Sequence, residues 1–255
     1  MPGYDMLITG GRVLDYQSGL DAVRDIGVRD GVIQEVSEDG LSRDGAAQVV
    51  NAEGKWVMPG VVDAHVHVAG AFFGPSDMDY SVGLGQLAVA GVTTALDLGG
   101  TPEGVMDSLK RGGAGINVGG LMVMAPGVTI TRDDPPRGET RGIVSDAIQR
   151  GALGIKMLGG YHPFTEEVTA GIIEECNEQR AYIAFHVGTK STGSRLDGLR
   201  LVPDLMGSHG RLHIAHVNAY CRGSVLPAPE ETLEALEIIS GLRGRAVSEV
   251  HMAVP

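Results

Sequence analysis

The chain has 255 residues, of which 43% are hydrophobic, 4% aromatic and 20% charged. This length allows one large domain or two modest ones, and the composition is that of an ordinary globular protein. The 32 acidic and 20 basic residues give a net charge of −12 without a basic run, which argues against binding to nucleic acid or to an anionic membrane surface. The two cysteines lack CxxC spacing and the N-terminus lacks a secretion signal, so we expect a reduced, cytoplasmic protein.

Residues 4–57 consist of short runs that predict small β elements. Apolar or alternating segments occur at residues 6–8, 11–14, 25–28 and 32–36. Asp30-Gly31, between the last two segments, is a strong hairpin signal. We therefore expect a small β layer without a catalytic role before residue 58.

Residues 57–68 contain two histidines in a predicted strand. Pro59-Gly60 is typical of a turn, and the valine-rich run after it predicts a strand buried on both faces. Because alternate side chains of a strand share a face, His65 and His67 should point the same way. Two neutral imidazoles on one rigid wall are suitable ligands for zinc or a similar cation. Alternatively, the two histidines lie at a strand end and form hydrogen bonds with water and backbone groups.

From residue 59 onward, apolar runs alternate with helix-like stretches. The further strand candidates are residues 93–97, 118–124, 154–157, 182–187, 212–217 and 246–254. A capping threonine followed by two acidic residues at 165–167 predicts a helix start. The side chains assigned to the inner face of this helix are Ile172, Ile173 and Cys176. A second helix is predicted to begin at residues 229–231. The side chains assigned to its inner face are Leu233, Leu236 and Ile239.

The residues at the predicted strand ends recur at regular intervals. They lie 27 to 35 residues apart and are His67, Asp97, Met124, Lys156, His186, His216 and His251. A βα unit needs roughly 30 residues, and repeated units close into a barrel whose strand-end residues surround one mouth. An open doubly wound sheet would instead require a G-x-G-x-x-G loop after the first strand, which the sequence does not provide.

The predicted fold class is therefore α/β, with a TIM-type (β/α)8 barrel over residues 58–255. This region accommodates about seven strands, whereas a complete barrel has eight strands and about 250 residues. We interpret the chain as a C-terminally truncated form that lacks strand eight.

Lys156 lies inside an apolar run at residues 154–158. A bare ammonium in such a place costs several kcal/mol unless it is paired or neutralised. One solution is reaction with carbon dioxide, which gives a carbamate able to bridge two metals. The alternatives are an ammonium that extends out of the barrel mouth and a catalytic or Schiff-base lysine.

Further histidines follow the later strands. His186 ends the fifth predicted strand and His216 ends the sixth, and both should face the mouth. His213 lies three residues before His216, so it should face away and have a structural role. The candidate substrate contacts at other strand ends are Asp97, Asn218 and His251. A solvated loop residue or a buried, hydrogen-bonded histidine is the alternative at these positions.

Taken together, these residues resemble the amidohydrolase superfamily of metal-dependent barrel hydrolases. The matching pattern is Pro59-Gly60-x-x-Asp63-x-His65-x-His67 on strand one, Lys156 on strand four, His186 on strand five and His216-Val217 on strand six. The strand-four lysine and the His-Val-Asn step look most like dihydropyrimidinases, hydantoinases, dihydroorotases and aminoacylases. Residues 1–57 look like the N-terminal part of the small β-sandwich domain that flanks such barrels.

The resemblance implies a hydrolase that cleaves a non-peptide carbon–nitrogen bond in an amide or cyclic amide. Two divalent metals, expected to be zinc, would be held by His65 and His67, by His186 and His216, and by a bridging carbamylated Lys156. A hydroxide between the two cations would attack the carbonyl, and Tyr161 would stabilise the oxyanion. Relatives also use an aspartate on strand eight, which this sequence lacks. The chain alone is therefore expected to bind metal weakly and to hydrolyse little.

Two other functions stay open at this point. Deaminases of the same superfamily use one metal and lack the bridging lysine, so Lys156 argues against them. A non-catalytic barrel, or an inactive fragment used for assembly, has no need for several imidazoles at its mouth. We expect a small-molecule amide as the substrate and a homo-oligomer for the full-length form.

Overall fold

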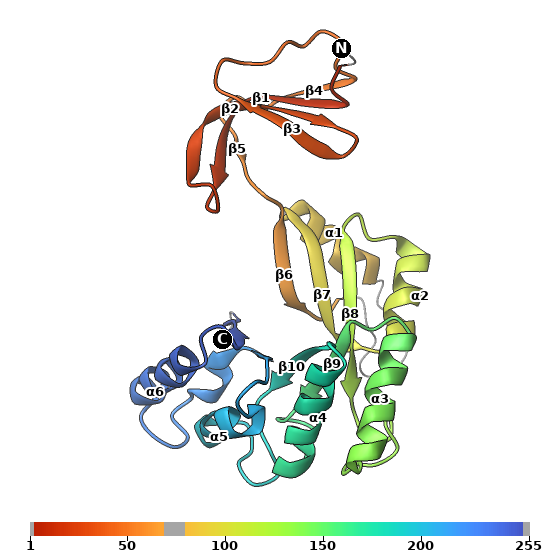
Figure 1. Cartoon of the computed structure of the whole chain (residues 1–255), viewed down its shortest axis with the longest axis vertical. Helices are drawn as coiled ribbons and strands as arrows, with labels where there is room; N and C mark the ends of the chain where they lie inside the picture. Colours follow the sequence, from red (N-terminus) through yellow and green to blue (C-terminus); the bar gives the residue numbers. More distant parts are fainter. Residues whose placement is uncertain (1–2, 69–79, 252–255) are drawn as a thin grey trace. The chain divides into compact units, whose positions relative to one another are not determined.

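The computed structural model describes residues 3–68 and 80–251. The chain divides into two compact units, Met1–Val61 and Val62–Pro255, which are drawn in Figure 1. Among the described helices, none combines the length and the apolar character that a membrane span requires.

The N-terminal unit is a mixed β-sheet. Its strands are β1 (Met6–Asp15), β2 (Leu20–Arg29), β3 (Val32–Ser37), β4 (Gln48–Asn51) and β5 (Trp56–Val57). Strand β1 pairs antiparallel with β2 and parallel with β4 and β5. Strands β2 and β3 pair antiparallel around Asp30 and Gly31, which have φ values of 53° and 71°. Aspartate and glycine tolerate this left-handed conformation, so the predicted hairpin is confirmed.

The second unit contains one sheet with the order β12-β11-β10-β9-β8-β7-β6, counted over residues 62–68 and 80–251. Every pair from β7 to β12 is parallel. The strands are β6 (Val61–Val66), β7 (Val92–Gly100), β8 (Asn117–Met124), β9 (Gly154–Leu158), β10 (Tyr182–His186), β11 (Leu212–Ile214) and β12 (Ala246–Ser248).

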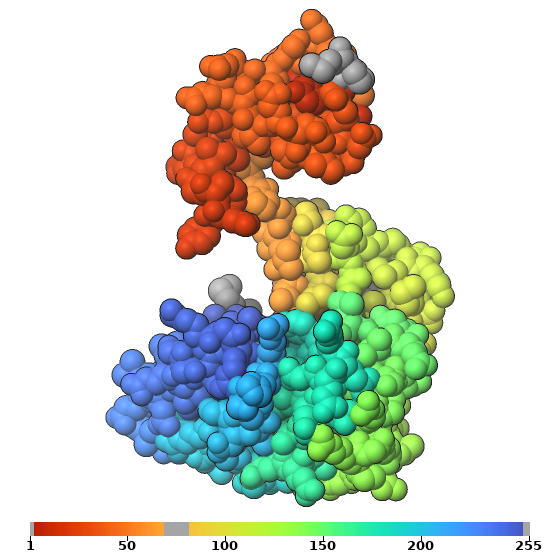
Figure 2. All heavy atoms as spheres, viewed as in Figure 1, coloured from red at the N-terminus to blue at the C-terminus, as the bar shows by residue number. Residues whose placement is uncertain are grey.

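Helices separate successive strands and cover the outer face of the sheet. They are α1 (Tyr80–Val89), α2 (Pro102–Gly112), α3 (Arg137–Gln149), α4 (Glu166–Glu178), α5 (Leu196–Met206), the 3-10 helix η1 (Val217–Tyr220) and α6 (Ala228–Gly241). Helices α3 to α6 follow one another around the sheet (Figure 1), and their side chains form a continuous surface from green to blue in Figure 2. This sequential parallel topology confirms the predicted incomplete TIM-type barrel preceded by a small β segment.

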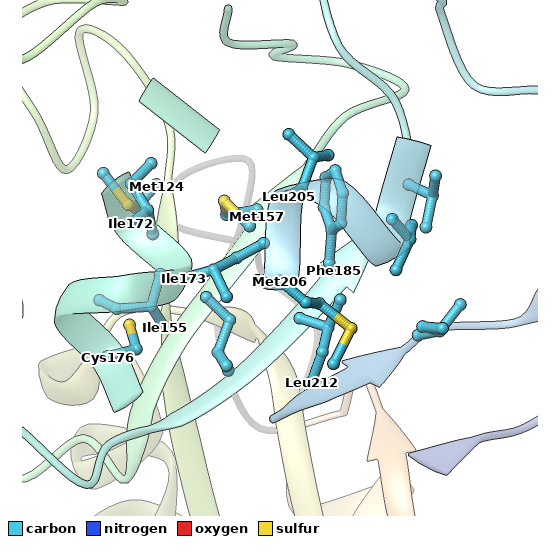
Figure 3. Packing of buried hydrophobic residues seen from close by; sticks show 14 of the residues in the cluster. Met124, Ile155, Met157, Ile172, Ile173, Cys176, Phe185, Leu205, Met206 and Leu212 are labelled. Atoms are coloured by element: carbon cyan, nitrogen blue, oxygen red, sulfur yellow. The ribbon is translucent and has the colours of Figure 1, made fainter. Parts of the chain in front are cut away.

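The main core lies between the sheet and helices α4 and α5. Figure 3 shows Ile155 and Met157 of β9 close to Ile172 and Ile173 of α4. Because side chains alternate along a strand, Lys156 faces the opposite side of β9, toward the barrel interior. The core packing of β9 therefore determines where the lysine points.

The start and the inner face of α4 agree with the sequence prediction. Its N-cap Thr165 accepts a hydrogen bond from the Val168 backbone N–H, and two glutamates occupy the first turn. The predicted inner-face residues Ile172, Ile173 and Cys176 are all fully or almost fully buried.

The predicted inner face of α6 is wrong at Leu233 and Leu236 but right at Ile239, which packs against the main core. Leu233 and Leu236 are 64% and 54% exposed, whereas Glu231 and Ala235 are buried. The Glu231 carboxylate accepts backbone hydrogen bonds in the preceding loop, which includes Gly223. These bonds turn the polar side chain inward and rotate the leucines toward solvent.

The last two strands are shorter than predicted. Strand β11 ends at Ile214, because His216 adopts a left-handed conformation with φ of 35° and begins η1. Strand β12 ends at Ser248, so His251 lies beyond it and is exposed. Residues 252–254 of the predicted strand lie outside the described residues.

Candidate metal centre

The five predicted metal ligands come from four different strands. His65 lies on β6 and His67 directly follows it, Lys156 lies on β9, His186 ends β10, and His216 follows β11. In a parallel barrel the carboxyl ends of all strands meet at one mouth. The carboxyl-terminal parts of these strands and the residues directly after them therefore present the five side chains to one region.

The side chains are in mutual contact. The Nε2 atoms of His65 and His67 are 3.2 Å apart, and Lys156 Nζ is 3.5 Å from His65 Nε2. The ring centroid of His216 lies 5.3 Å from that of His65 and 4.5 Å from that of His186. The structure thus brings all five residues into one cluster, and their role as ligands stays a prediction.

The donor atoms suit a metal ion. Two nitrogens bound to one tetrahedral zinc at 2.0–2.1 Å are about 3.3 Å apart, which matches the separation of the two Nε2 atoms. His216 Nδ1 is buried and has no hydrogen-bond partner. Burial lowers the pKa of His186 to about 4 and that of His216 to about 3. Both imidazoles are therefore neutral at pH 7, which is the form that binds a cation.

Lys156 is almost completely enclosed, with 1% of its surface exposed. Burial lowers the pKa of its amine to about 7, because a low-dielectric environment disfavours the ammonium form. A large fraction of the lysine is consequently neutral near physiological pH. A neutral amine is a nucleophile, whereas an ammonium is not.

Glu249 is the important residue that the sequence reasoning missed. It directly follows β12, and its carboxylate contacts His65 Nδ1, His213 Nε2 and the backbone N–H of His216. Burial alone would raise its pKa, but the hydrogen bonds from His213 and His65 hold the pKa well below its usual range. An acidic residue in the predicted strand at 246–254 was the available signal. It is the same kind of signal that identified Lys156.

The prediction that His213 faces away from the mouth is wrong, because its ring centroid lies 5.9 Å from that of His65 and it shares the register, and so the sheet face, of Lys156. Its Nδ1 is 3.0 Å from the Tyr182 hydroxyl and its Nε2 is 3.0 Å from Glu249 Oε2. The side chain is buried. His213 therefore links Tyr182 of β10 to Glu249, and the Glu249 carboxylate in turn binds the backbone of His216.

Asp97 supports the loop next to His67. One carboxylate oxygen accepts from the Val68 backbone N–H at 2.7 Å and the other from the Gly99 backbone N–H at 2.8 Å. A Cβ at Gly99 would lie under 3.0 Å from His67 Nδ1. Glycine at this position therefore leaves room for the imidazole.

Tyr161 lies at the exposed side of the cluster. It is 70% exposed, and its ring centroid is 5.8 Å from that of His186. His186 Nε2 is in turn 2.8 Å from the Ser194 hydroxyl. Tyr161 is thus accessible to a bound molecule and adjacent to one of the proposed ligands.

Asn218 and His251 form a pair at the other side. The Asn218 side-chain amide donates to the His251 backbone carbonyl at 2.9 Å. The His251 ring centroid is 5.0 Å from that of His216. Both predicted substrate contacts therefore border the cluster.

Tyr220 fixes the strand ends that carry two of the histidines. Its fully buried hydroxyl donates to the Ala215 carbonyl at 2.7 Å and accepts from the Val187 N–H at 2.8 Å. These neighbours directly adjoin His216 and His186.

Comparisons with known proteins relate the chain to enzymes that act on carbon–nitrogen bonds. A dihydroorotase from Anaeromyxobacter dehalogenans (strain 2CP-C) is 26% identical over 246 residues, which cover 84% of this chain and 54% of the relative. The chain thus spans about half the length of the curated relatives it matches. No protein-family model matches it.

Solved structures share the fold. An N-acyl-D-glutamate deacylase from Bordetella bronchiseptica, complexed with zinc and a phosphonate inhibitor, superposes with a TM-score of 0.70 and 18% identity, covering 98% of this chain and 58% of that one. A D-hydantoinase superposes with a TM-score of 0.64 and 19% identity, covering 96% and 57%. The barrel topology agrees with these structures, and the sequence relationship to dihydroorotases extends along most of the chain. The chain therefore resembles enzymes of the amidohydrolase superfamily in sequence and in fold.

Proposed function

We propose that this chain carries the metal-binding part of a hydrolase that cleaves a non-peptide carbon–nitrogen bond in an amide or cyclic amide. The observation that carries this proposal is the cluster of four imidazoles and one buried lysine at the strand ends. The relatives named above support the proposal, because a dihydroorotase, a hydantoinase and an N-acyl deacylase each act on an amide or a cyclic amide. The proposal concerns the activity of the whole protein, of which residues 58–255 would supply the barrel and residues 1–57 part of a β-sandwich.

The five residues would divide between two divalent metals, with zinc the first candidate. His65 and His67 would hold one metal, His186 and His216 would hold the second, and Lys156 would bridge them as a carbamate. Bound metals would lower the pKa of a water to give a nucleophile at neutral pH and would polarise the carbonyl of the scissile bond.

Carbamylation would use the neutral form of Lys156. The Nζ lone pair attacks the carbon of carbon dioxide, a C–N bond forms, and one C=O electron pair moves onto oxygen. The nitrogen then releases a proton to water, which leaves a carboxylate in place of an amine. The lowered pKa of the amine supports this step, because the attacking lone pair is available near pH 7.

The remaining residues would bind and orient the substrate. The Tyr161 hydroxyl would donate a hydrogen bond to the carbonyl oxygen as negative charge develops on it. Asn218 and His251 would contact the substrate from the opposite border of the cluster. Asp97 would act through the backbone that carries His67.

Metal analysis of the purified chain tests the proposal. We expect up to two metals per chain, with tighter binding when bicarbonate is present, and incorporation of labelled carbon dioxide that is absent in Lys156→Met. One metal per chain with release of ammonia from a substrate would favour a mononuclear deaminase. A folded chain without metal would favour a non-catalytic barrel used for assembly.

Tyr161→Phe tests the proposed catalytic hydroxyl in the longest active form of the protein. We expect a loss of kcat with little change in Tm, because the side chain is mostly exposed. An unchanged kcat on a panel of cyclic ureides and N-acyl amino acids would remove Tyr161 from the mechanism.

A further inference from the structure

Glu249 joins the two edge strands of the barrel sheet. It directly follows β12, whereas its partner His65 lies on β6 at the other end of the strand order. The two residues are 184 positions apart in the sequence. Their contact crosses the interior of the curled sheet.

The carboxylate of Glu249 accepts from three donors. Oε1 contacts Nδ1 of His65, and Oε2 lies 3.0 Å from Nε2 of His213 and 2.8 Å from the backbone nitrogen of His216. An ionised carboxylate only accepts hydrogen bonds, so the His65 nitrogen that faces it must carry the proton. The opposite nitrogen, Nε2, then has a free lone pair directed at His67 and Lys156.

We propose that Glu249 is a positioning residue of the metal centre, an inference that rests on the proposed function. It holds His65 in the Nδ1–H tautomer, so that Nε2 is the metal-binding atom. Through the same carboxylate it holds the backbone of His216 in the left-handed turn at φ of 35°. One side chain thereby aligns a ligand from each of the two proposed metal pairs. Carboxylates that bind the distal nitrogen of a metal-binding histidine commonly have this effect.

The geometry favours positioning over direct ligation by Glu249. Ligand atoms of His65, His213 and Glu249 do lie within 4.8 Å of one another. A cation among them would, however, displace the protons that His65 and His213 direct at the carboxylate. It would also lie beside the His216 N–H, whose positive end repels a cation and which cannot act as a ligand.

Glu249→Gln tests the positioning role, because a glutamine amide has only one acceptor oxygen whereas the carboxylate has two. If its oxygen faces His65, its NH2 group faces the His216 N–H, and two donors oppose each other. If the amide is turned, its NH2 group faces His65 Nδ1 and favours the Nε2–H tautomer, which removes the metal-binding lone pair. Either orientation therefore disturbs one of the two ligands.

The matched control is Glu231→Gln. Glu231 is a buried glutamate whose carboxylate, like that of the partly buried Glu249, accepts backbone hydrogen bonds, here from Gly223, Val225 and Leu226. It therefore reproduces the structural cost of losing a backbone-binding carboxylate at a distance from the histidines. A second variant, His213→Gln, removes one partner of Glu249 and leaves the contacts to His65 and His216.

The experiment measures zinc affinity of the full chain by chelator competition, together with histidine tautomers by long-range 1H–15N NMR in the metal-free state. We expect Glu249→Gln to weaken zinc binding by roughly 10- to 100-fold and to remove the Nδ1–H signal of His65. Glu231→Gln should leave both the affinity and the tautomer unchanged, and His213→Gln should have a smaller effect than Glu249→Gln.

The proposal is overturned if wild-type His65 carries its proton on Nε2, a result that does not depend on any variant folding. It is also overturned if Glu249→Gln weakens zinc binding no more than Glu231→Gln does. A wild-type chain that binds no metal would refute the proposed function. In that case the tautomer of His65 in Glu249→Gln still decides the positioning role.

Discussion

Replacing Lys156 by methionine should change how the stability of the metal-free protein depends on pH. Methionine is unbranched and similar in length, so it fills the space of the lysine without an ionisable group. In the wild type, burial lowers the pKa of Lys156 from 10.5 to about 7. Between these two values the unfolded chain binds one more proton than the folded chain at this site. The free energy of unfolding must then rise with pH by up to about 1.4 kcal/mol per unit.

The magnitude follows from the two pKa values. Below pH 7 the folded protein carries the full cost of enclosing the ammonium, and this cost falls as the pH rises from 7 toward 10.5. Between pH 6.5 and 9.5 the wild type should gain about 3 kcal/mol at this site relative to Lys156→Met. Below pH 7 the variant should be the more stable protein, since it does not bury a charge.

Urea unfolding in the presence of a chelator, without added bicarbonate, measures this difference at each pH. Lys190→Met is the control, because Lys190 is 38% exposed and paired with Asp133 and Asp134. The wild type and the control should share the same pH slope, and only Lys156→Met should lack it. Parallel stability curves for the wild type and Lys156→Met between pH 6.5 and 9.5 would refute the assignment of Lys156 as a buried amine.

Three further results are expected. Gly99→Ala should weaken zinc binding by roughly 10- to 100-fold in a chelator competition, because the added Cβ overlaps the His67 ring; wild-type affinity would contradict the observed packing. Tyr220→Phe should lower the free energy of unfolding by about 1–3 kcal/mol, because a buried backbone N–H loses its acceptor, and an unchanged denaturation midpoint would be inconsistent with that bond. Iodoacetamide should modify the half-buried Cys221 before Cys176, which is fully buried and whose pKa is raised by burial to about 12; equal labelling rates in the native state would refute this order.

Local patterns were sufficient to predict the barrel and the cluster of proposed ligands. Alternation along β6 correctly predicted that His65 and His67 share a face, and the interval between strand ends correctly predicted the βα repeat. His216 lies beyond its strand, in a left-handed turn that the sequence did not indicate. Its approximate position was nevertheless predictable, because every residue near the carboxyl end of a barrel strand lies at the same mouth.

The features that were missed depend on contacts between residues far apart in the sequence or on turned polar side chains. Glu249 resembles a surface acid that follows a short apolar strand, and its importance comes from His65 at the opposite edge of the sheet. Glu231 resembles an ordinary acid in the first turn of a helix. Its carboxylate instead binds loop amides, and two residues of the predicted inner face of α6, Leu233 and Leu236, are exposed. Periodicity reports which positions share a face, but it does not report which face a hydrogen bond will select.

The balance of charge within the cluster explains why the buried lysine matters to the proposed centre. Imidazoles that bind a metal are neutral, so the histidines do nothing to offset two divalent cations. The carboxylates that act on them, Asp97 and Glu249, are already occupied by N–H donors. An amine at Lys156 would add no negative charge, and an ammonium would repel the metals. Conversion of the amine to a carbamate would supply an anion to the proposed centre. The same burial that makes the ammonium costly would thus make the neutral amine available for that reaction.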